Sequence, residues 1–218
     1  MKLNIFNLLL NYVLLKSNEM NIDESHGLHH SMDVLFFANS IYEEEVIEKP
    51  YLVQQSDIIY TSALLHDMCD NKYTDDVDTE LNNIYMYVKE MKTINTNYLT
   101  NPGDVDMVKS IIDTMSYSKV KKNGFPNLQE YQCAYNIVRE ADLLSAYDFD
   151  RCIVYKMQKH NTTFSEAFED AKVLFENRMF KHQEDGLLLT KYANRMHNIL
   201  STNAKWKIKK WNQFISKK

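Results

Sequence analysis

The chain has 218 residues, of which 44% are hydrophobic and 25% are charged, and its formal net charge at pH 7 is -5. This length favours one domain, residues 1–218, that is large enough to bury a substantial core. The net acidity argues against general binding to a phosphate backbone, so we expect no nucleic-acid partner. Only four glycines occur, and no glycine-rich loop is present, which excludes a Rossmann or P-loop nucleotide site.

The apolar start of the chain, Met1 to Leu15, has the hydrophobicity of a signal peptide. However, Asn4, Asn7 and Asn11 recur at helical spacing and define a polar face, and no small-residue cleavage site follows. The apolar run is also too short and too interrupted to span a bilayer. We therefore expect an amphipathic helix over residues 3–17, and no membrane partner.

Long helices joined by short connections are expected along the rest of the chain, because turn residues are scarce and no alternating strand pattern of useful length occurs. Ser25 is a candidate cap for the second helix, and Pro50 is expected to end it. Residues 116–126 are expected to form a loop. The expected helices cover about residues 26–49, 58–68, 77–94, 102–115, 128–147, 149–159 and 164–181, followed by one or two helices up to residue 215.

This pattern predicts an all-α, single-domain helical bundle. Its motif-bearing core is expected to cover about residues 20–155, with C-terminal helices within 164–218 packed on it. The basic C-terminal residues are interpreted as the solvated face of the last helix, and a role towards nucleic acid or an acidic partner is the alternative. These lysines are Lys205, Lys207, Lys209, Lys210, Lys217 and Lys218.

The three cysteines, Cys69, Cys133 and Cys152, are an odd number and show no CxxC spacing. We expect neither a disulfide framework nor a thiolate zinc site. A reducing, cytoplasmic compartment fits this cysteine usage.

An apolar run, Ala63 to Leu65, ends in His66, which is followed directly by Asp67. Neither side chain suits a hydrophobic core unless it has a partner, and a metal ion is the commonest partner for adjacent His and Asp residues. The alternative is a helix end at which both side chains face water.

Two further polar clusters interrupt apolar helices. His26 and His30 are four residues apart, so on a helix they would share a face and their imidazoles could bind one ion; a surface cluster of histidines, His29 included, is the alternative. Asp142 lies between Ala141 and Leu143 near an apolar face. A carboxylate there is costly unless it is paired or bound to a cation, and a hydrogen bond to an arginine or a backbone amide is the alternative.

The order of these residues, a His, then a His-Asp pair, then an Asp, resembles that of the HD-domain metal-dependent phosphohydrolases. Ser25–Val34 (SHGLHHSMDV) is similar to the S-H-D-x-x-H-x-x-R-V stretch of a bacterial HD subfamily that includes nucleotide pyrophosphatases. Leu64–Tyr73 (LLHDMCDNKY) looks like its L-L-H-D-x-x-D-x-K-[FY] motif. Ile111–Ser118 resembles its I-S-[FY] turn, and Ile137–Ala146 resembles its I-V-x-D-A-D-x-L-D-A stretch.

The resemblance implies that His30, His66, Asp67 and Asp142 bind a divalent metal ion inside a helical bundle of the HD-domain type. Mn²⁺ or Mg²⁺ suits two imidazoles, two carboxylates and a phosphate substrate best, with Fe²⁺, Co²⁺, Zn²⁺ and Ni²⁺ as further candidates. HD enzymes with two ions use extra histidines between the His-Asp pair and the last Asp. No histidine lies between His66 and His160, so one ion is expected.

The same resemblance implies roles for residues around the ion, where Asp67 is also expected to take part in catalysis. Lys72 is expected to hold a substrate phosphate, and Asp70 to orient the attacking water or accept its proton. His26 is expected to support the ligands or to contact a phosphate. Phosphate or sugar binding from a facing loop is expected of Ser116, Ser118 and Lys119.

The implied activity is hydrolysis of a small phosphorylated substrate, for example a (deoxy)nucleoside triphosphate that yields the monophosphate and pyrophosphate. A phosphodiesterase or nucleotidase of the same fold is one alternative, and an HD module that binds a nucleotide without turnover is another. Asp33 stands where the subfamily has an arginine, which bears on the substrate more than on the metal. The sequence defines neither the base and sugar preference nor the oligomeric state.

Overall fold

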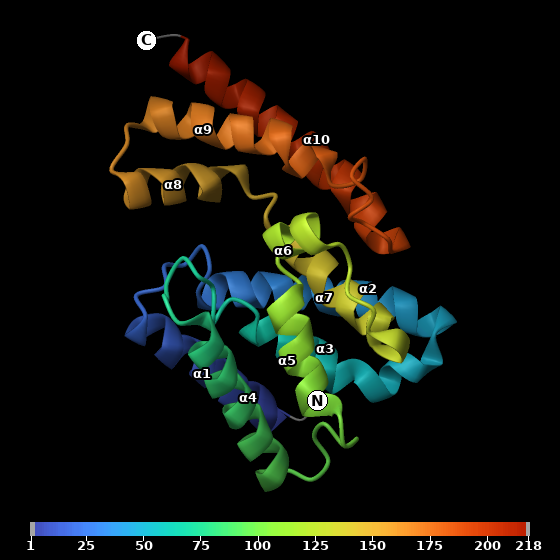
Figure 1. Cartoon of the computed structure of the whole chain (residues 1–218). Coiled ribbons are helices and arrows are strands. Elements are labelled where there is room, and N and C mark those ends of the chain that lie inside the picture. The colour runs from blue at the N-terminus through green and yellow to red at the C-terminus, as the bar shows by residue number, and fades with distance from the viewer. Residues whose placement is uncertain (1–2, 217–218) are drawn as a thin grey trace. The chain divides into compact units, whose positions relative to one another are not determined.

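The computed structural model describes residues 3–216, and every regular element within that range is helical (Figure 1). The all-α prediction is therefore confirmed. The chain forms two compact units that divide between Asp142 and Leu143. That the chain is one domain stays a prediction, and Lys217 and Lys218 of the basic C-terminus lie outside the described residues. No helix in the described range is long and apolar enough to cross a membrane.

The first unit consists of seven α-helices within the described residues, the last of which continues past Asp142. They are α1 (Leu3–Glu19), α2 (Leu28–Glu48), α3 (Ser56–Leu65), α4 (Val77–Ile94), α5 (Asp104–Thr114), α6 (Tyr117–Asn123) and α7 (Gln132–Ser145). Short 3-10 turns at Pro50–Gln55 and Gln129–Tyr131 precede α3 and α7. Helix α3 packs against α1, α2 and α5, so it is the central helix of this unit.

The burial of α3 follows from its sequence, SDIIYTSALL, which is apolar or small on nearly all sides. A helix that is apolar all round is stable only inside a core. Leu64 and Leu65 are fully buried, and burial of each such side chain contributes roughly 1.5–3 kcal/mol. The Thr61 hydroxyl is also buried and shares a hydrogen bond of 2.7 Å with the Tyr98 hydroxyl. His66 therefore follows directly on the most buried helix of the unit, and it is buried itself.

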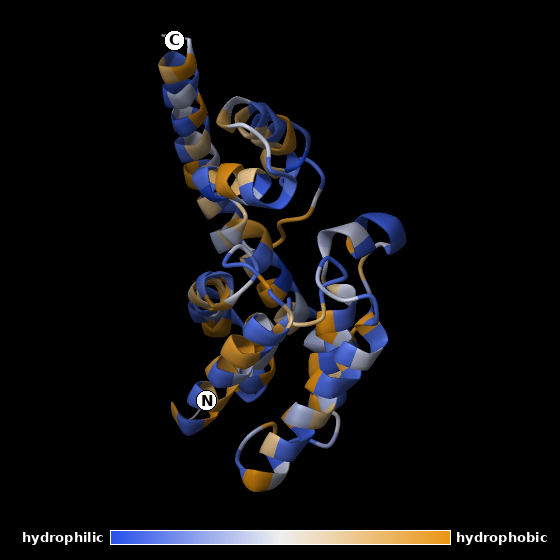
Figure 2. Ribbon diagram, turned by 90° about the vertical axis from the view of Figure 1, so that its left-hand side faces the viewer, coloured by the Kyte–Doolittle hydropathy of each residue, from blue (hydrophilic) through white to orange (hydrophobic). Residues whose placement is uncertain are grey.

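The second unit consists of α8 (Phe149–His160), α9 (Phe164–Asn177), a 3-10 turn (Met179–Lys181) and α10 (Lys191–Ile215). A capping box between Thr163 and Glu166 begins α9, which satisfies two backbone N–H groups that have no partner within the helix. Side chains from all three helices share one core, made of Phe149, Ile153, Ala167, Phe168, Ala171, Phe175 and Ala204 with their neighbours. Hydrophilic and hydrophobic residues alternate along these helices, as amphipathic elements require (Figure 2).

Several helix boundaries were predicted well and others were wrong. The helix over residues 77–94 is confirmed as α4. The predicted helix over 128–147 begins only at Gln132, the one over 164–181 ends at Asn177, and a single helix, α10, covers the C-terminal part. The loop predicted over 116–126 contains α6, because the Ser116 side chain caps its first turn and Gly124, with φ of 75°, ends it.

Two corrections concern the candidate site. Helix α2 begins at Leu28, so His26 is not on the helix, and Ser25 does not cap it. Instead, the Asp23 carbonyl accepts hydrogen bonds from the N–H groups of His26 and Gly27, which form a turn. Helix α3 ends at Leu65 rather than Met68, because the Met68 N–H bonds to the Leu65 carbonyl in a tighter turn.

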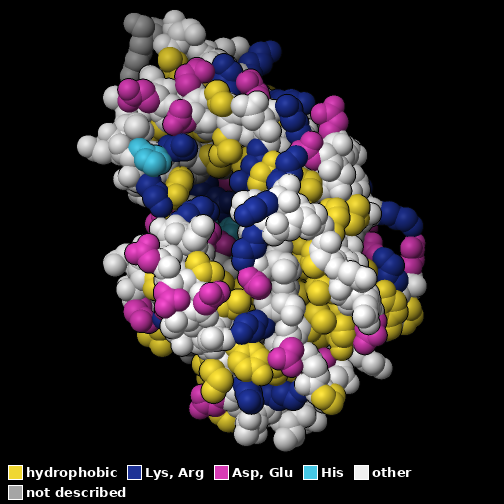
Figure 3. Space-filling model, in the orientation of Figure 1, with side chains coloured by type: hydrophobic (Ala, Val, Ile, Leu, Met, Phe, Trp, Pro, Cys, Tyr) yellow, Lys and Arg dark blue, Asp and Glu magenta, His cyan; other side chains and the backbone are white. Residues whose placement is uncertain are grey.

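Both signs of charge are spread over the surface. Lys and Arg side chains are interspersed with Asp and Glu side chains on the face shown in Figure 3. This follows from a composition of 25 basic and 30 acidic residues.

Candidate metal centre

Three segments of the first unit supply the side chains that were predicted to bind metal. His30 lies in the first turn of α2, His66 and Asp67 directly follow α3, and Asp142 lies in α7. Both histidines are buried, whereas Asp67 and Asp142 keep 13% and 23% of their side-chain surface exposed. The cluster thus lies at the edge of the core, where it is open to solvent on its carboxylate side.

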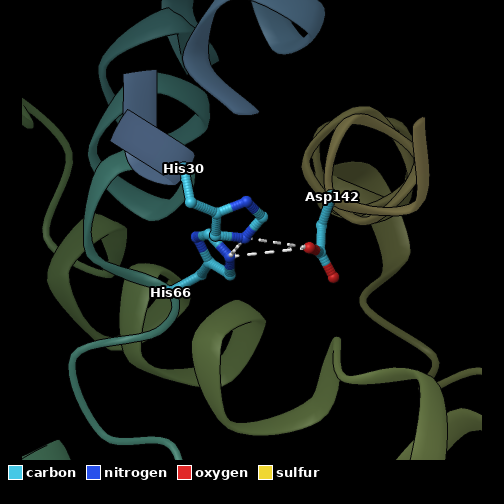
Figure 4. Close-up of side chains that lie close together, drawn as sticks. All are labelled: His30, His66 and Asp142. Atoms are coloured by element: carbon cyan, nitrogen blue, oxygen red, sulfur yellow. Dashed lines mark hydrogen bonds and ion pairs between the residues drawn. The ribbon is translucent and has the colours of Figure 1, made fainter. Parts of the chain in front are cut away.

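The imidazoles of His30 and His66 and the carboxylate of Asp142 point towards one another (Figure 4). The two Nε2 atoms are 3.1 Å apart, and Asp142 Oδ1 lies 3.4 Å from that of His30 and 3.6 Å from that of His66. The Asp67 carboxylate faces the same nitrogens, with Oδ2 3.2 Å from His30 Nε2 and Oδ1 3.3 Å from His66 Nε2. The structure therefore brings together all four side chains.

The backbone selects the tautomer of His66. Its Nδ1 atom lies 2.9 Å from the Ala63 carbonyl oxygen, which can only accept a hydrogen bond, so Nδ1 carries the proton. In the neutral ring Nε2 is then bare and directed into the cluster. A histidine whose outer nitrogen donates to a carbonyl in this way is typical of metal ligands.

Without a cation, the two carboxylates can be satisfied only by protonation of the imidazoles. Two neutral imidazoles bring at most one proton to the middle of the cluster, from His30 Nε2, because His66 carries its proton on Nδ1. Two protonated rings would instead direct N–H groups at each other across 3.1 Å. A divalent cation resolves both problems, because every ring nitrogen and carboxylate oxygen then offers it a lone pair.

The spacing of these atoms also suits an ion. Ligand atoms at 2.0–2.2 Å from a metal are separated by about 2.8–3.6 Å when the angles between them are right or tetrahedral. The five nitrogen–nitrogen and nitrogen–oxygen distances in the cluster are between 3.1 and 3.6 Å. The donor set and spacing of His30, His66 and Asp142 therefore both fit one divalent cation, and Asp67 faces the two histidines beside them.

The pKa values of the cluster are set by opposing effects. Burial, the largest single effect, lowers the pKa of His66 and raises that of Asp67, but the opposite charges and hydrogen bonds within the cluster together outweigh it. As a result, the pKa of His66 lies well above its usual value and the pKa of Asp67 well below. Despite burial, hydrogen bonds from His30 and His66 likewise hold the pKa of Asp142 far below its usual value. Both carboxylates are thus ionised at neutral pH, as metal ligands must be.

A second polar cluster adjoins the first through His26, whose ring lies edge-on to that of His30 with ring centroids 5.9 Å apart. The Lys72 ammonium group donates to His26 Nε2 at 2.8 Å and to Asp70 Oδ2 at 3.1 Å. Burial, together with the nearby Lys72 and His30, lowers the pKa of His26 to about 4, so this ring is neutral at pH 7. The structure thus places three more of the predicted residues side by side.

The predicted residues of the facing segment are arranged differently. Ser116 and Ser118 lie 3.3 Å apart at the start of α6, and the Lys119 ammonium group lies 2.6 Å from a carboxylate oxygen of Asp113. These contacts tie all three into the turn between α5 and α6. Burial raises the pKa of the Cys69 thiol to about 12, with Lys119 opposing the rise. Lys119 therefore acts electrostatically on the segment that follows Asp67.

Some residues of the site were interpreted only in part from sequence. His29 is exposed, as predicted, and lies 3.7 Å from the carboxylate of Asp33.

Arg139 and Glu140 in α7 were not expected to be buried, yet both are, with a nitrogen–oxygen distance of 3.4 Å. The sequence signal that could have indicated this burial is an adjacent pair of charged residues within an apolar helix segment. Breaking such a buried pair costs about 3–5 kcal/mol, so the pair helps to fix the helix that carries Asp142.

Two other residues were given no role from the sequence: Tyr73 was noted only as the last residue of the motif that begins at Leu64, and Asp23 was not noted. Asp23 and Tyr73 are fifty residues apart, and a hydrogen bond of 2.8 Å joins the Tyr73 hydroxyl to Asp23 Oδ2. Tyr73 also lies 3.0 Å from His26 Nδ1. They connect the turn before α2 to the segment after α3.

No protein-family model, curated protein or solved structure matches this chain. What the protein does must therefore follow from the chemistry of these side chains.

Proposed function

We propose that this protein is a metal-dependent phosphohydrolase of the HD-domain type that acts on small nucleotides with water as the nucleophile. A (deoxy)nucleoside triphosphate, cleaved to the monophosphate and pyrophosphate, is the proposed substrate. The observation that carries the proposal is the cluster of His30, His66, Asp67 and Asp142, in which two imidazoles and two carboxylates meet with nitrogen–oxygen and nitrogen–nitrogen distances of 3.1 to 3.6 Å.

His30, His66, Asp67 and Asp142 would hold one divalent ion. Two imidazoles and two carboxylates accept Mn²⁺ and also Mg²⁺, Fe²⁺, Co²⁺, Zn²⁺ or Ni²⁺. When bound, such an ion supplies an activated water and neutralises charge that develops on a phosphoryl oxygen. The hydrogen bond from His66 to the Ala63 carbonyl keeps the ring in the orientation that this role needs.

The adjoining cluster supplies the remaining groups. The Lys72 ammonium group, between His26 and Asp70, offers a positive charge to a substrate phosphate. Asp70 is the proposed acceptor for a proton from the attacking water. Phosphoryl transfer depends mainly on such positioning and charge stabilisation, so a cation beside a metal site suits a phosphate ester or anhydride. Ser116, Ser118 and Lys119 remain candidates for contacts to phosphate or sugar.

The compartment is proposed from the thiols. Cys69, Cys133 and Cys152 are all free in the structure, which fits a reducing, cytoplasmic environment. We propose no nucleic-acid or membrane partner.

The proposal is tested by metal analysis and product analysis on the same preparations. Wild-type protein, His66→Ala and Asp67→Ala are stripped with a chelator, reloaded with Mn²⁺ or Mg²⁺ and incubated with a broad panel of nucleotides. We expect about one ion per wild-type chain and release of pyrophosphate from a triphosphate, with both lost in the two variants. His29→Ala is the matched control, because His29 is exposed and lies next to His30.

The products separate the alternatives. Release of inorganic phosphate from a monophosphate indicates a nucleotidase, and opening of a cyclic nucleotide indicates a phosphodiesterase of the same fold. Tight nucleotide binding without turnover under any metal indicates a binding module. A wild-type protein that retains no ion and cleaves no nucleotide would contradict the proposal altogether.

A further inference from the structure

The turn before α2 and the segment after α3 are joined by a chain of hydrogen bonds that ends at Lys72. Asp23 accepts from the Tyr73 hydroxyl at 2.8 Å and from the Ser25 backbone N–H at 2.8 Å. His26 Nδ1 lies 3.0 Å from the Tyr73 hydroxyl and 2.7 Å from the Ser25 hydroxyl. On the other side of the ring, His26 Nε2 lies 2.8 Å from the Lys72 ammonium group.

The groups at the two ends of this hydrogen-bond series, Lys72 and Asp23, determine the direction of each hydrogen bond between them. An ammonium group can only donate, so His26 Nε2 is the acceptor and its proton is on Nδ1. A carboxylate can only accept, so the Tyr73 hydroxyl donates to Asp23 and its oxygen is left to accept from Nδ1–H. The Ser25 hydroxyl oxygen, 2.7 Å from Nδ1, is a second acceptor for the same N–H. One placement of protons thus gives the Lys72, His26 and Tyr73 donors an acceptor each.

We infer that Asp23 and Tyr73 are positioning residues that hold His26 in the Nδ1–H tautomer, so that its bare Nε2 fixes the Lys72 ammonium group beside the metal cluster. The inference rests on the phosphate role proposed above for Lys72. Asp70 holds the same ammonium group from another side, at 3.1 Å. Lys72 is exposed, and without these two acceptors its long side chain would lose rotamer freedom only on binding substrate.

Asp23→Asn is the sharpest test, because it keeps the shape and adds a donor. The new amide N–H would donate to the Tyr73 oxygen, and the Tyr73 hydroxyl would then turn its proton towards His26 Nδ1. The His26 proton would move to Nε2, where it opposes the Lys72 ammonium group. Adding Tyr73→Phe to Asp23→Asn removes the hydroxyl that reverses, so it should restore the Nδ1–H tautomer through Ser25.

The tautomer is read from long-range proton–nitrogen NMR correlations of the His26 ring, assigned with His26→Gln. We expect the Nδ1–H form in wild type and in Tyr73→Phe, the Nε2–H form in Asp23→Asn, and a return to Nδ1–H in the double variant. Asp33→Asn is the matched control, since Asp33 is a half-exposed carboxylate beside another histidine. An Nε2–H tautomer in wild type, or an unchanged one in Asp23→Asn, would overturn the inference.

The consequence for Lys72 is measured by calorimetric titration of the Mn²⁺-loaded protein with inorganic phosphate. Asp23→Asn and Lys72→Met should each weaken phosphate binding by about tenfold, the loss of one charge-assisted hydrogen bond, while the Mn²⁺ content stays at the wild-type value. Normal phosphate affinity in Lys72→Met would overturn the phosphate role proposed above, whereas the spectra would still decide the hydrogen-bond assignment. Normal phosphate affinity in Asp23→Asn alone would overturn the positioning of Lys72.

Discussion

One backbone carbonyl orients His66 for the proposed metal site. The hydrogen bond to Ala63 directs Nε2 at His30 Nε2, 3.1 Å away, and the Asp67 carboxylate faces both of these nitrogens. A cluster arranged in this way gains stability when a cation arrives, since binding to the folded state alone favours folding.

This leads to a prediction about metal and stability. Mn²⁺ at a free concentration of one hundred times its dissociation constant should raise the free energy of unfolding by about 2.7 kcal/mol. Asp142→Asn, which replaces a ligand oxygen by an amide nitrogen, should lose most of this gain. Asp113→Asn should keep it, because Asp113 pairs with Lys119 on the surface. The measurement is chemical unfolding followed by far-UV circular dichroism, and equal stabilisation of the Asp142 variant would exclude that residue as a ligand.

A second prediction concerns pH and a buried network in the second unit. The Tyr147 hydroxyl donates to the Met179 carbonyl, which leaves its oxygen to accept from His197 Nδ1 at 2.6 Å and His182 Nδ1 at 3.2 Å. Burial and the nearby Lys205 lower the pKa of His197. A lowered histidine pKa means that protonation favours the unfolded chain, so this contribution to stability is complete above about pH 6.5 and declines as the pH falls below that value.

Tryptophan fluorescence isolates this effect, because the two tryptophans, Trp206 and Trp211, both lie in the second unit. Between pH 7.5 and 5.5 the unfolding free energy of wild type should fall more steeply than that of His197→Gln, by up to about 1.4 kcal/mol per pH unit for one proton. His160→Gln, at an exposed histidine of α8, should follow wild type. Parallel pH profiles for wild type and His197→Gln would show that His197 does not titrate in this way.

At the residue scale, the sequence predicted site residues where polar side chains interrupt an apolar run. The pair His66–Asp67 and the isolated Asp142 were visible as polar interruptions of apolar runs, and the structure brings them together with His30. The partnership of Asp23 with Tyr73 was not visible, because it depends on how two irregular segments approach each other. His26 was expected on the helix that carries His30, and it reaches His30 from a turn instead.

At the scale of elements, Ser116 has two competing interpretations that one pair of variants can separate. Its side-chain oxygen accepts from the Lys119 N–H at 3.4 Å as the cap of α6, whereas the resemblance implies contact with substrate. If capping is its role, Ser116→Ala should cost about 1 kcal/mol of stability and Ser116→Gly only a few tenths. If Ser116 binds substrate, both variants should raise KM equally.

We expect the capping result. The oxygen of Ser116 is already engaged with the Lys119 N–H and lies 3.3 Å from Ser118, so little of its bonding capacity remains for a ligand. Thermal unfolding and steady-state kinetics of both variants check this, with Ser110→Ala on the exposed face of α5 as the control. A higher KM in Ser116→Gly at unchanged stability would contradict it.

Element-scale prediction succeeded for long periodic segments and failed at short ones. The helix over residues 77–94 has acidic residues at its start and an apolar stripe, and it agrees with α4. Helix α6 is only seven residues long, too short for periodicity to distinguish it from a loop, so only the Ser116 and Gly124 caps could have indicated it. The early end of α3 was hidden as well, because a tight turn after Leu65 continues the same helical dihedral angles at His66.

At the scale of the whole molecule, length alone favoured one domain, yet the contacts divide the chain into units on either side of Asp142. Each unit has its own buried residues, with α3 at the centre of the first and the aromatic core of Phe149, Phe168 and Phe175 in the second. Composition could not reveal this division, since α7 runs through it without a proline, a glycine or a polar linker.

The division into two units predicts which helices metal binding stabilises. The candidate ligands all lie in the first unit, whereas both tryptophans lie in the second. Since each unit has its own core, saturating Mn²⁺ should slow hydrogen exchange at the amides of α2, α3 and the first turns of α7, and leave the exchange of α9 and α10 unchanged. The midpoint of thermal unfolding followed by tryptophan fluorescence should likewise stay constant, while the midpoint for far-UV circular dichroism rises. His66→Ala, which removes a ligand, should show neither change on addition of Mn²⁺. Equal protection of α3 and α10 would instead mean that both units unfold as one cooperative domain, the organisation that the length of the chain predicts.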